Sequence, residues 1–291
     1  MTGARGPWNV GLTVVREDQR LGPEPFYQEM IAGLEGVLGP RDATLLLQIV
    51  TSRKDEEATC ARWAGRGAVD AVLLVDLETD DARVELVRRL GLPAVVVGDP
   101  STAAGLPAVW TDDAAAMRHA VGVLAGLGHT VIGRVSGPSP LAHSRIRTEA
   151  FREAVREGGL RAAETEAEYS EEAGRLATLR LLSAPDRPTA VIYDDDLMAL
   201  GGLSAAAGKG LAVPGDLSLL AWDDSALCQL SSPSLSVMGH DVRAIGEQAA
   251  AAVLDLVEGR ARPLYRAPTA TFLRRESVSA PGAAGLPQPA A

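Results

Sequence analysis

The feature that most constrains this chain is a regular alternation of short apolar runs with longer amphipathic stretches. The apolar runs are rich in Val, Leu and Ile, which is typical of parallel strands buried on both faces, and the amphipathic stretches have the period of covering helices. The pattern continues through both halves of the 291 residues, and that length suits two domains of roughly 150 residues each. It predicts an α/β protein.

The boundaries of the expected elements follow from the same pattern. In the first half we expect strands at 8–15, 43–50, 71–75, 93–98 and 108–110, with helices at 25–38, 54–66 and 80–90. In the second half we expect strands at 130–137, 163–168, 189–193, 217–222, 235–238 and 264–273, with helices at 113–127, 141–158, 170–184, 196–209 and 241–258. Residues 279–291 are rich in Pro, Gly and Ala and predict a disordered tail.

Charge and composition restrict the partners of this chain. The formal net charge is −10, and no run of Lys or Arg forms the basic stripe that contact with a nucleic-acid backbone needs. The chain carries neither an apolar signal segment nor a run of 18 apolar residues, so it is expected to be cytosolic and to make no membrane contact. Cys60 and Cys228 lack metal or redox spacing and are expected to be buried thiols.

Polar residues follow nearly every expected strand. Arg16 and Asp99 do so in the first half, and Asp195, Asp223 and His240 in the second. Ligands of open parallel sheets bind beyond the carboxyl ends of the strands, and carboxylates suit hydroxyl and amine groups. The competing interpretation is that each Asp only caps a helix, so the cluster carries more weight than any one member.

Motifs of catalysis and cofactor binding are missing from the sequence. It contains no GxGxxG after the first strand, no GxxxxGK[ST] and no GxSxG. Four histidines without HxH or HExxH spacing provide no zinc site, and three consecutive aspartates at 194–196 point to different faces, which disfavours a magnesium site. We therefore expect no enzyme, no metal and no cofactor.

Several segments in order resemble the regulatory core of the lactose-repressor (LacI) family. They are VGLTVV with EPFYQEMIAGLE, DEEATCARWAGRGAVDAVLLV, LGHTVIGRVSGP, SRIRTEAFREAV, RPTAVIYDDDLMALG, GLAVPGDLSLLAWDDSAL, SPSLSVMGHDVRAIGEQAAAAVLDLV and the closing RRES. Together they cover about residues 8–278. The resemblance implies the fold of type-1 periplasmic sugar-binding proteins, with two doubly wound parallel-sheet lobes joined by three crossing segments.

The resemblance also implies which residues bind an effector. Arg147 and Asp223 match the arginine and aspartate that typically bind effectors, Phe26 and Tyr27 match an aromatic pair that opens the first helix, and Tyr169 matches a stacking aromatic. Core packing is the alternative for Phe26. Asp195 stands where relatives usually have Asn, and His240 where Gln is common. Because an ionised Asp only accepts hydrogen bonds, an amino sugar or polyol becomes more plausible beside an ordinary sugar.

Domain limits and partners are implied in the same way. We expect an N-terminal lobe of residues 8–112 plus 240–262 and a C-terminal lobe of 113–239 plus 263–278, with crossings near 111–113, 238–240 and 261–264. The lobes would close on a small effector, and a homodimer would contact operator DNA only through a helix-turn-helix head that this chain lacks. The alternative function is a solute-binding protein of a sugar transporter.

Overall fold

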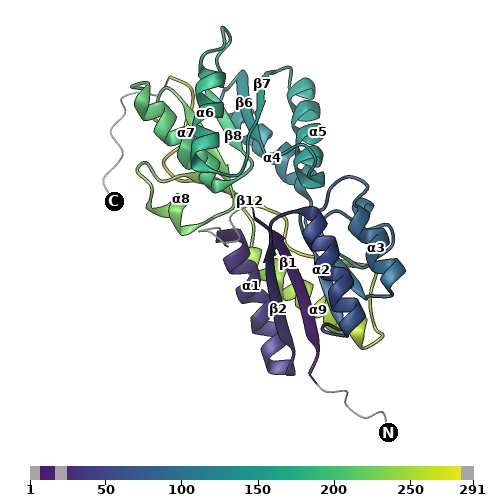
Figure 1. Ribbon diagram of the computed structural model, residues 1–291. Helices are drawn as coiled ribbons and strands as arrows, with labels where there is room; N and C mark the ends of the chain where they lie inside the picture. Colours follow the sequence, from purple (N-terminus) through teal and green to yellow (C-terminus); the bar gives the residue numbers. More distant parts are fainter. Residues whose placement is uncertain (1–6, 17–24, 283–291) are drawn as a thin grey trace. The chain divides into compact units, whose positions relative to one another are not determined.

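Two six-stranded sheets organise the chain in the computed structural model, which describes residues 7–16 and 25–282 (Figure 1). One unit comprises the described residues up to Thr111 together with Asp241–Pro268, and the other comprises Asp112–His240 with the segment from Thr269. Each unit is a parallel or mostly parallel sheet covered by helices. The predicted α/β class and doubly wound lobes are confirmed.

The first unit has an entirely parallel sheet in which the chain order reverses beside β1. In spatial order its strands are β11 (Leu264–Arg266), β5 (Ala108–Trp110), β4 (Ala94–Val97), β3 (Ala71–Leu74), β1 (Asn9–Val15) and β2 (Thr44–Val50). Its helices are α1 (Pro25–Leu38), α2 (Arg53–Arg66), α3 (Ala82–Leu90) and α9 (Val242–Val257), with a 3₁₀ turn at Gly39–Arg41 and another at Pro100–Thr102. Helices α1 and α9 pack on one face of this sheet and α2 and α3 on the other, giving two apolar layers (Figure 1).

The second unit repeats this architecture with one antiparallel edge strand. In spatial order its strands are β12 (Thr271–Leu273), β10 (Ser236–Gly239), β9 (Ser218–Trp222), β8 (Ala190–Tyr193), β6 (Val131–Ser136) and β7 (Arg161–Glu166). Its helices are α4 (Asp113–Gly126), α5 (Ala142–Glu157), α6 (Glu171–Leu182), α7 (Asp196–Gly208) and the short α8 (Ala226–Leu230). The core on one face of the sheet is formed with α4 and α5, and the core on the other with α6 and α7. Within the described ranges, no helix is long and apolar enough to cross a membrane.

Several helices begin at polar residues that follow the ends of strands. Ser52, Asp112, Ser170 and Asp195 each accept a hydrogen bond from the backbone N–H three residues later, which satisfies a donor that the first helical turn leaves open. Since the carboxyl ends of parallel strands meet at one edge of a sheet, Ser52 lies at this edge of the first sheet, and Ser170 and Asp195 lie at this edge of the second. Helix capping and ligand binding therefore both use polar residues such as Ser and Asp that follow the ends of strands.

The predicted final strand at 264–273 is wrong, because the structure has two short strands in different sheets. Leu264–Arg266 pairs in parallel with β5, whereas Thr271–Leu273 pairs antiparallel with β10. The last crossing between the units therefore lies at Pro268–Thr269, beyond the expected 261–264, and residues 263–268 belong to the first unit. Pro268 has no N–H to donate to a ladder, which suits a break between two strands.

The predicted disordered tail at 279–291 is wrong for its first residues. The Ser279 N–H donates to Oγ of Ser218 at 3.1 Å, and the Ser279 carbonyl lies 2.9 Å from Nε2 of the buried His129. These contacts tie the segment to β9 and to the loop before β6. The remainder of that prediction, residues 283–291, lies outside the described residues.

A pair of glycines sets the close approach of α1 and α9. A Cβ on Gly33 would overlap the carbonyl oxygen of Arg243, and a Cβ on Gly246 would overlap that of Met30. We expect Gly33→Ala to lower the free energy of unfolding by about 3 kcal/mol, because backbone of the facing helix must move. Gly36 on the same helix is exposed and has open space at its Cβ, so Gly36→Ala should raise stability by roughly 0.5–1 kcal/mol. Thermal unfolding of both variants checks this, and equal midpoints would contradict the packing described.

Candidate functional site

The carboxyl edge of the second sheet collects most of the predicted ligand-binding residues. Asp195 follows β8, Asp223 follows β9 and His240 follows β10, while Arg147 reaches this edge from α5. Because β8, β9 and β10 are parallel neighbours, their ends are adjacent. Sequence reasoning thus named side chains that the fold brings to one edge of a single unit.

Arg147 is a buried cation fixed on three sides. Its Nε donates to Asp113 Oδ1 at 2.8 Å, its Nη1 donates to the Asp194 carbonyl at 3.3 Å, and its guanidinium carbon lies 4.4 Å from the centre of the Trp222 ring. Burial alone would lower the pKa of Arg147, but Asp113 and Asp194 raise it above its ordinary value. Within the described part of the chain, Nη2 has no hydrogen-bond partner, so one end of the planar fork is available to a ligand.

Asp113 is the counter-charge that holds Arg147. It lies in the first turn of α4, and 15% of its side chain is exposed. Burial raises its pKa, but the charge of Arg147, aided by His240 and His143, lowers it below the ordinary value overall. The pair therefore stays ionised, and the guanidinium is oriented before any ligand arrives.

Asp223 and His240 form the second polar pair of this edge. Asp223 Oδ1 lies 2.8 Å from His240 Nδ1, and Asp223 has a left-handed backbone with φ of 67°. Positive φ is uncommon outside glycine and is enriched at functional turns, where surrounding contacts enforce it. The His240 ring meets the edge of Trp222 with ring centres 6.0 Å apart, so one indole contacts both Arg147 and His240.

Three consecutive aspartates after β8 have different roles. Asp194 is fully buried and forms a two-point ion pair with Arg134, with Nη2–Oδ2 at 2.7 Å and Nε–Oδ1 at 3.2 Å. Asp195 Oδ1 caps α7 by accepting the Met198 N–H at 3.0 Å. Asp196 is buried in the first turn of α7, where its Oδ1 accepts the Leu197 N–H. Asp194 is therefore structural, whereas Asp195 and Asp196 lack a cation among the described ion pairs.

Four buried polar atoms lack a hydrogen-bond partner among the described residues, and all four lie near this edge. They are Asp196 Oδ2, Trp222 Nε1, Ser225 Oγ and His240 Nε2. Leaving a buried polar atom unsatisfied costs about 1–3 kcal/mol, so native proteins usually pair such atoms with protein, water or ligand. Their concentration beside Arg147 and Asp223 makes this edge the candidate binding site.

Tyr169 lies after β7 and is held by α5. Its hydroxyl lies 2.9 Å from His143 Nε2 and 3.1 Å from Ser144 Oγ, and its ring stacks on His143. A Cβ on Gly137 would overlap the Tyr169 hydroxyl, so the glycine after β6 makes room for it. Tyr169 also interacts electrostatically with Arg147, which brings it to the same edge as the other candidates.

The first unit gathers Arg16, Phe26 and Tyr27 into a separate cluster. The Arg16 guanidinium carbon lies 5.0 Å from the centre of the Tyr27 ring, and Phe26 meets that ring edge-on with centres 5.5 Å apart. The Tyr27 hydroxyl donates to Asp76 Oδ2 at 2.5 Å, immediately beyond β3. Phe26 is half-buried and packs on the α1–α9 core, and its contact with a ligand stays a prediction.

Asp99 has a local role in the structure. Its Oδ1 accepts the Ser101 N–H at 2.9 Å and caps the 3₁₀ turn at Pro100–Thr102. No described contact joins its side chain to Arg16, Phe26 or Tyr27. Its ligand-binding role stays a prediction from sequence alone.

Comparison with known proteins places these features in a family. A model of the periplasmic binding protein-like domain matches residues 121–278. The HTH-type transcriptional repressor CytR of Escherichia coli K12 is 31% identical over 241 residues, which is 81% of this chain and 70% of CytR. The chain belongs to the LacI family of transcriptional regulators.

Other LacI-family proteins agree with this assignment. The HTH-type transcriptional regulator MalR of Streptomyces coelicolor is 34% identical over 224 residues, covering 74% of this chain and 64% of MalR. A solved LacI-family regulator from Bifidobacterium animalis subsp. lactis is 37% identical, with a TM-score of 0.87 and coverage of 94% of this chain and 98% of that one. The solved complex of the transcriptional regulator CelR with cellobiose is 26% identical, with a TM-score of 0.85 and coverage of 94% and 85%.

In this LacI-family chain, sequence reasoning missed Trp222 and Asp113 as members of the site. Trp222 is the last residue of an apolar strand, which predicts a core residue, yet its ring stacks on Arg147. Asp113 reads as a first-turn acid beside the capping Asp112. Their positions are the signal that could have identified them. Trp222 ends a strand directly before Asp223, and Asp113 begins the first helix of its unit.

Proposed function

We propose that this chain is the effector-sensing core of a DNA-binding transcriptional regulator. Its ligand is a small polyhydroxylated compound bound at the carboxyl edge of the second sheet. The observation that carries the proposal is the coincidence of an oriented Arg147–Asp113 pair, the Asp223–His240 pair and the unsatisfied buried atoms at one edge. For the first unit, ligand contact by Arg16, Phe26, Tyr27 and Asp99 is part of the same proposal.

The chemistry of the edge suits hydroxyl groups. Carboxylates such as Asp223 accept hydrogen bonds from neighbouring hydroxyls, and the open Nη2 of Arg147 donates to a hydroxyl or ring oxygen. Trp222 is fully buried, so its role is to support other side chains. Its contacts with Arg147 and His240 keep those two side chains in fixed orientations. Rigid support of this kind favours selective recognition.

The relatives support a regulator over the alternative of a transporter's solute-binding protein. CytR and MalR are named HTH-type transcriptional regulators, and the CelR structure holds cellobiose, which supports a sugar-like effector here. We propose that operator DNA is read by a helix-turn-helix segment rather than by the two sheet units, whose chain has a net charge of −10. A role as a DNA-bound regulator also implies a cytoplasmic location and no catalytic turnover.

A thermal-shift screen tests the proposed function. The chain is heated with mono- and disaccharides including cellobiose, amino sugars, polyols and nucleosides. A compound present at 100 times its Kd should stabilise the folded state by about 2.7 kcal/mol, which raises the unfolding midpoint by several degrees. A panel in which no compound raises the midpoint contradicts an effector of these classes.

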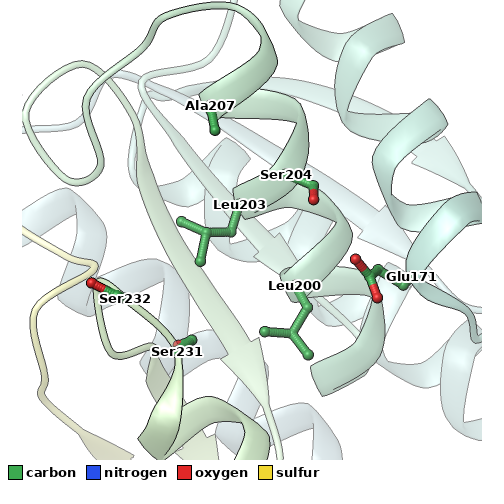
Figure 2. Close-up of a pocket in the computed structure, with 7 residues that line it drawn as sticks. All are labelled: Glu171, Leu200, Leu203, Ser204, Ala207, Ser231 and Ser232. Atoms are coloured by element: carbon green, nitrogen blue, oxygen red, sulfur yellow. The ribbon is translucent and has the colours of Figure 1, made fainter.

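A second copy of the chain is the proposed partner of an exposed apolar face on the second unit. Figure 2 shows this face, where Leu200, Leu203 and Ala207 of α7 line a surface hollow of about 370 Å³ together with the polar residues Glu171, Ser204, Ser231 and Ser232. Next to it, Leu230 at the end of α8 is 84% exposed. Contiguous exposed apolar surface of this kind is typical of an interaction site, and closed two-fold dimers are the commonest assembly.

We expect Leu230→Glu to weaken this dimer by at least tenfold, because a charge would have to be buried in an apolar interface. Sedimentation equilibrium across protein concentrations measures the change. Leu46→Glu is the matched control, since Leu46 is also an exposed leucine but lies on β2 of the first unit. Equal association constants for the two variants would show that this face does not form the dimer.

A further inference from the structure

Charge at the carboxyl edge of the second sheet is unevenly compensated. Three of its aspartates have an arginine each, with Asp113 paired to Arg147, Asp194 to Arg134 and Asp224 to Arg275 at 2.7–2.8 Å. Asp223 has His240. Asp195 and Asp196 have no cationic partner among the described residues, although Asp196 is buried.

The neighbours of this aspartate pair do not supply the missing charge. The groups that act on it from adjacent elements are the Asp223 carboxyl after β9, the Ser225 hydroxyl and the Cys228 thiol on α8, and none of them is a cation. Arg275, which also acts on Cys228, donates to Asp224 Oδ2 and to the Leu235 carbonyl. Arg147 is bound to Asp113 and to the Asp194 carbonyl.

The unsatisfied buried atoms give an independent indication of what fits here. Asp196 Oδ2 can only accept when ionised. His240 Nε2 is also an acceptor in the tautomer whose Nδ1–H donates to Asp223, and Ser225 Oγ can accept as well. Trp222 Nε1 can only donate, and the Ser225 hydroxyl can also donate, toward Asp196. A ligand group that completes this set therefore brings hydrogen-bond donors to Asp196 Oδ2 and His240 Nε2, and a positive charge on it would compensate the aspartate pair.

We propose that the ligand carries a primary ammonium group, held by Asp195 and Asp196 beside Asp223, so that the effector is an amino sugar or an amino polyol. An ammonium has three donors and no acceptor, which matches the uncompensated pair and its unsatisfied oxygen. This inference rests on the proposed function, because it assigns a chemical class to the ligand of the same edge.

Proton exchange should accompany binding of such a ligand. Burial, together with the neighbouring Asp196, raises the pKa of Asp195 to about 8, and burial likewise raises the pKa of Asp196. At neutral pH the empty pair therefore retains a proton, which an incoming ammonium displaces. Calorimetric titrations at pH 7 in two buffers of different ionisation enthalpy should detect release of a fraction of a proton per ligand bound.

Matched pairs of sugars test the ligand class on the whole chain. The probes are glucosamine with glucose, galactosamine with galactose, and mannosamine with mannose, each titrated by calorimetry at pH 7. In at least one pair we expect the amine to bind tenfold or more tightly than its hydroxyl counterpart. A neutral sugar that binds as tightly as or more tightly than its amine overturns the ammonium inference and leaves the proposed function intact. No binding by any member of the pairs also overturns the ammonium inference, and the proposed function is then decided by the wider thermal-shift screen of disaccharides, polyols and nucleosides.

Asp195→Asn is the diagnostic variant, because Asn keeps the oxygen that caps α7 and loses the charge. We expect it to reduce the preference for the amine at least tenfold. Asp216→Asn removes a carboxylate from the loop before β9, at the opposite end of the strand, and should leave the preference unchanged. An unchanged preference in Asp195→Asn would overturn the assignment.

A second measurement needs no ligand. The folded protein holds a proton on Asp195 that the unfolded chain has already lost at pH 6, so the unfolding midpoint should fall as the pH rises toward 8. This fall should be smaller in Asp195→Asn, whose midpoint should exceed that of the natural chain most clearly above pH 8. Parallel pH profiles of the two proteins would contradict the uncompensated aspartate pair.

Discussion

Arg134→Leu is expected to destabilise the second unit by about 3–5 kcal/mol, because it leaves the Asp194 carboxylate buried without its counter-charge. Neither side chain has measurable solvent exposure, and the pair is joined at two points. The guanidinium also donates to Thr148 Oγ1 at 2.6 Å and to the Ser144 carbonyl at 3.3 Å. Thermal unfolding should show the midpoint of this unit lowered by roughly 10 °C.

Two further variants make this expectation specific. Arg152→Leu breaks an exposed ion pair with Glu164 in the same unit, where the arginine side chain is 64% exposed, and should cost less than about 1 kcal/mol. Adding Asp194→Asn to Arg134→Leu should recover part of the loss, because the uncompensated charge is then removed. A midpoint for Arg134→Leu equal to that of Arg152→Leu would contradict a buried pair.

Loss of the Arg147 guanidinium is expected to have the largest effect on ligand binding. Methionine fills much of the same volume without a charge or a donor, so Arg147→Met should weaken binding of the effector by about 100-fold, as expected for hydrogen bonds from a charged group. The same change leaves Asp113 without the cation that lowers its pKa, so that carboxyl should titrate at higher pH in the variant. Isothermal titration of the best compound from the thermal-shift screen measures the affinity.

Arg145→Met is the matched control for this change. Arg145 lies two residues earlier on α5, is 41% exposed and pairs with Glu149. We expect its affinity for the effector to stay within threefold of the natural chain. If Arg147→Met lowered the unfolding midpoint but bound the effector unchanged, Arg147 would be a structural residue only.

The lobe architecture and much of the site could be predicted from sequence because their signals are local. Runs such as TAVIY and LSLLAW are long enough to identify buried strands, and the polar residues after them fall at the carboxyl edge whatever the sheet order. Arg147 and Asp223 were identified through motifs, and the structure brings both to that edge. Their role in binding stays a prediction.

The features that sequence reasoning missed depend on non-local contacts. Strands β11 and β12 have three residues each, too few for a periodic signal, and their separation into two sheets is fixed only by pairing with β5 and β10. The Trp222 contact with Arg147 joins residues 75 positions apart in the numbering of this chain. Asp99 shows the opposite case, since a strand-end acid with a local signal caps a turn in the structure.

Hydrogen exchange with mass spectrometry, performed with and without the best stabilising compound, tests the central claim most directly. We expect the ligand to slow exchange in peptides spanning Asp194–Met198, Trp222–Ser225 and Gly239–Asp241, where the unsatisfied atoms and the Asp223–His240 pair lie. Protection confined to the α7 surface around Leu200 and Leu203, or to segments that do not include this edge, would contradict it.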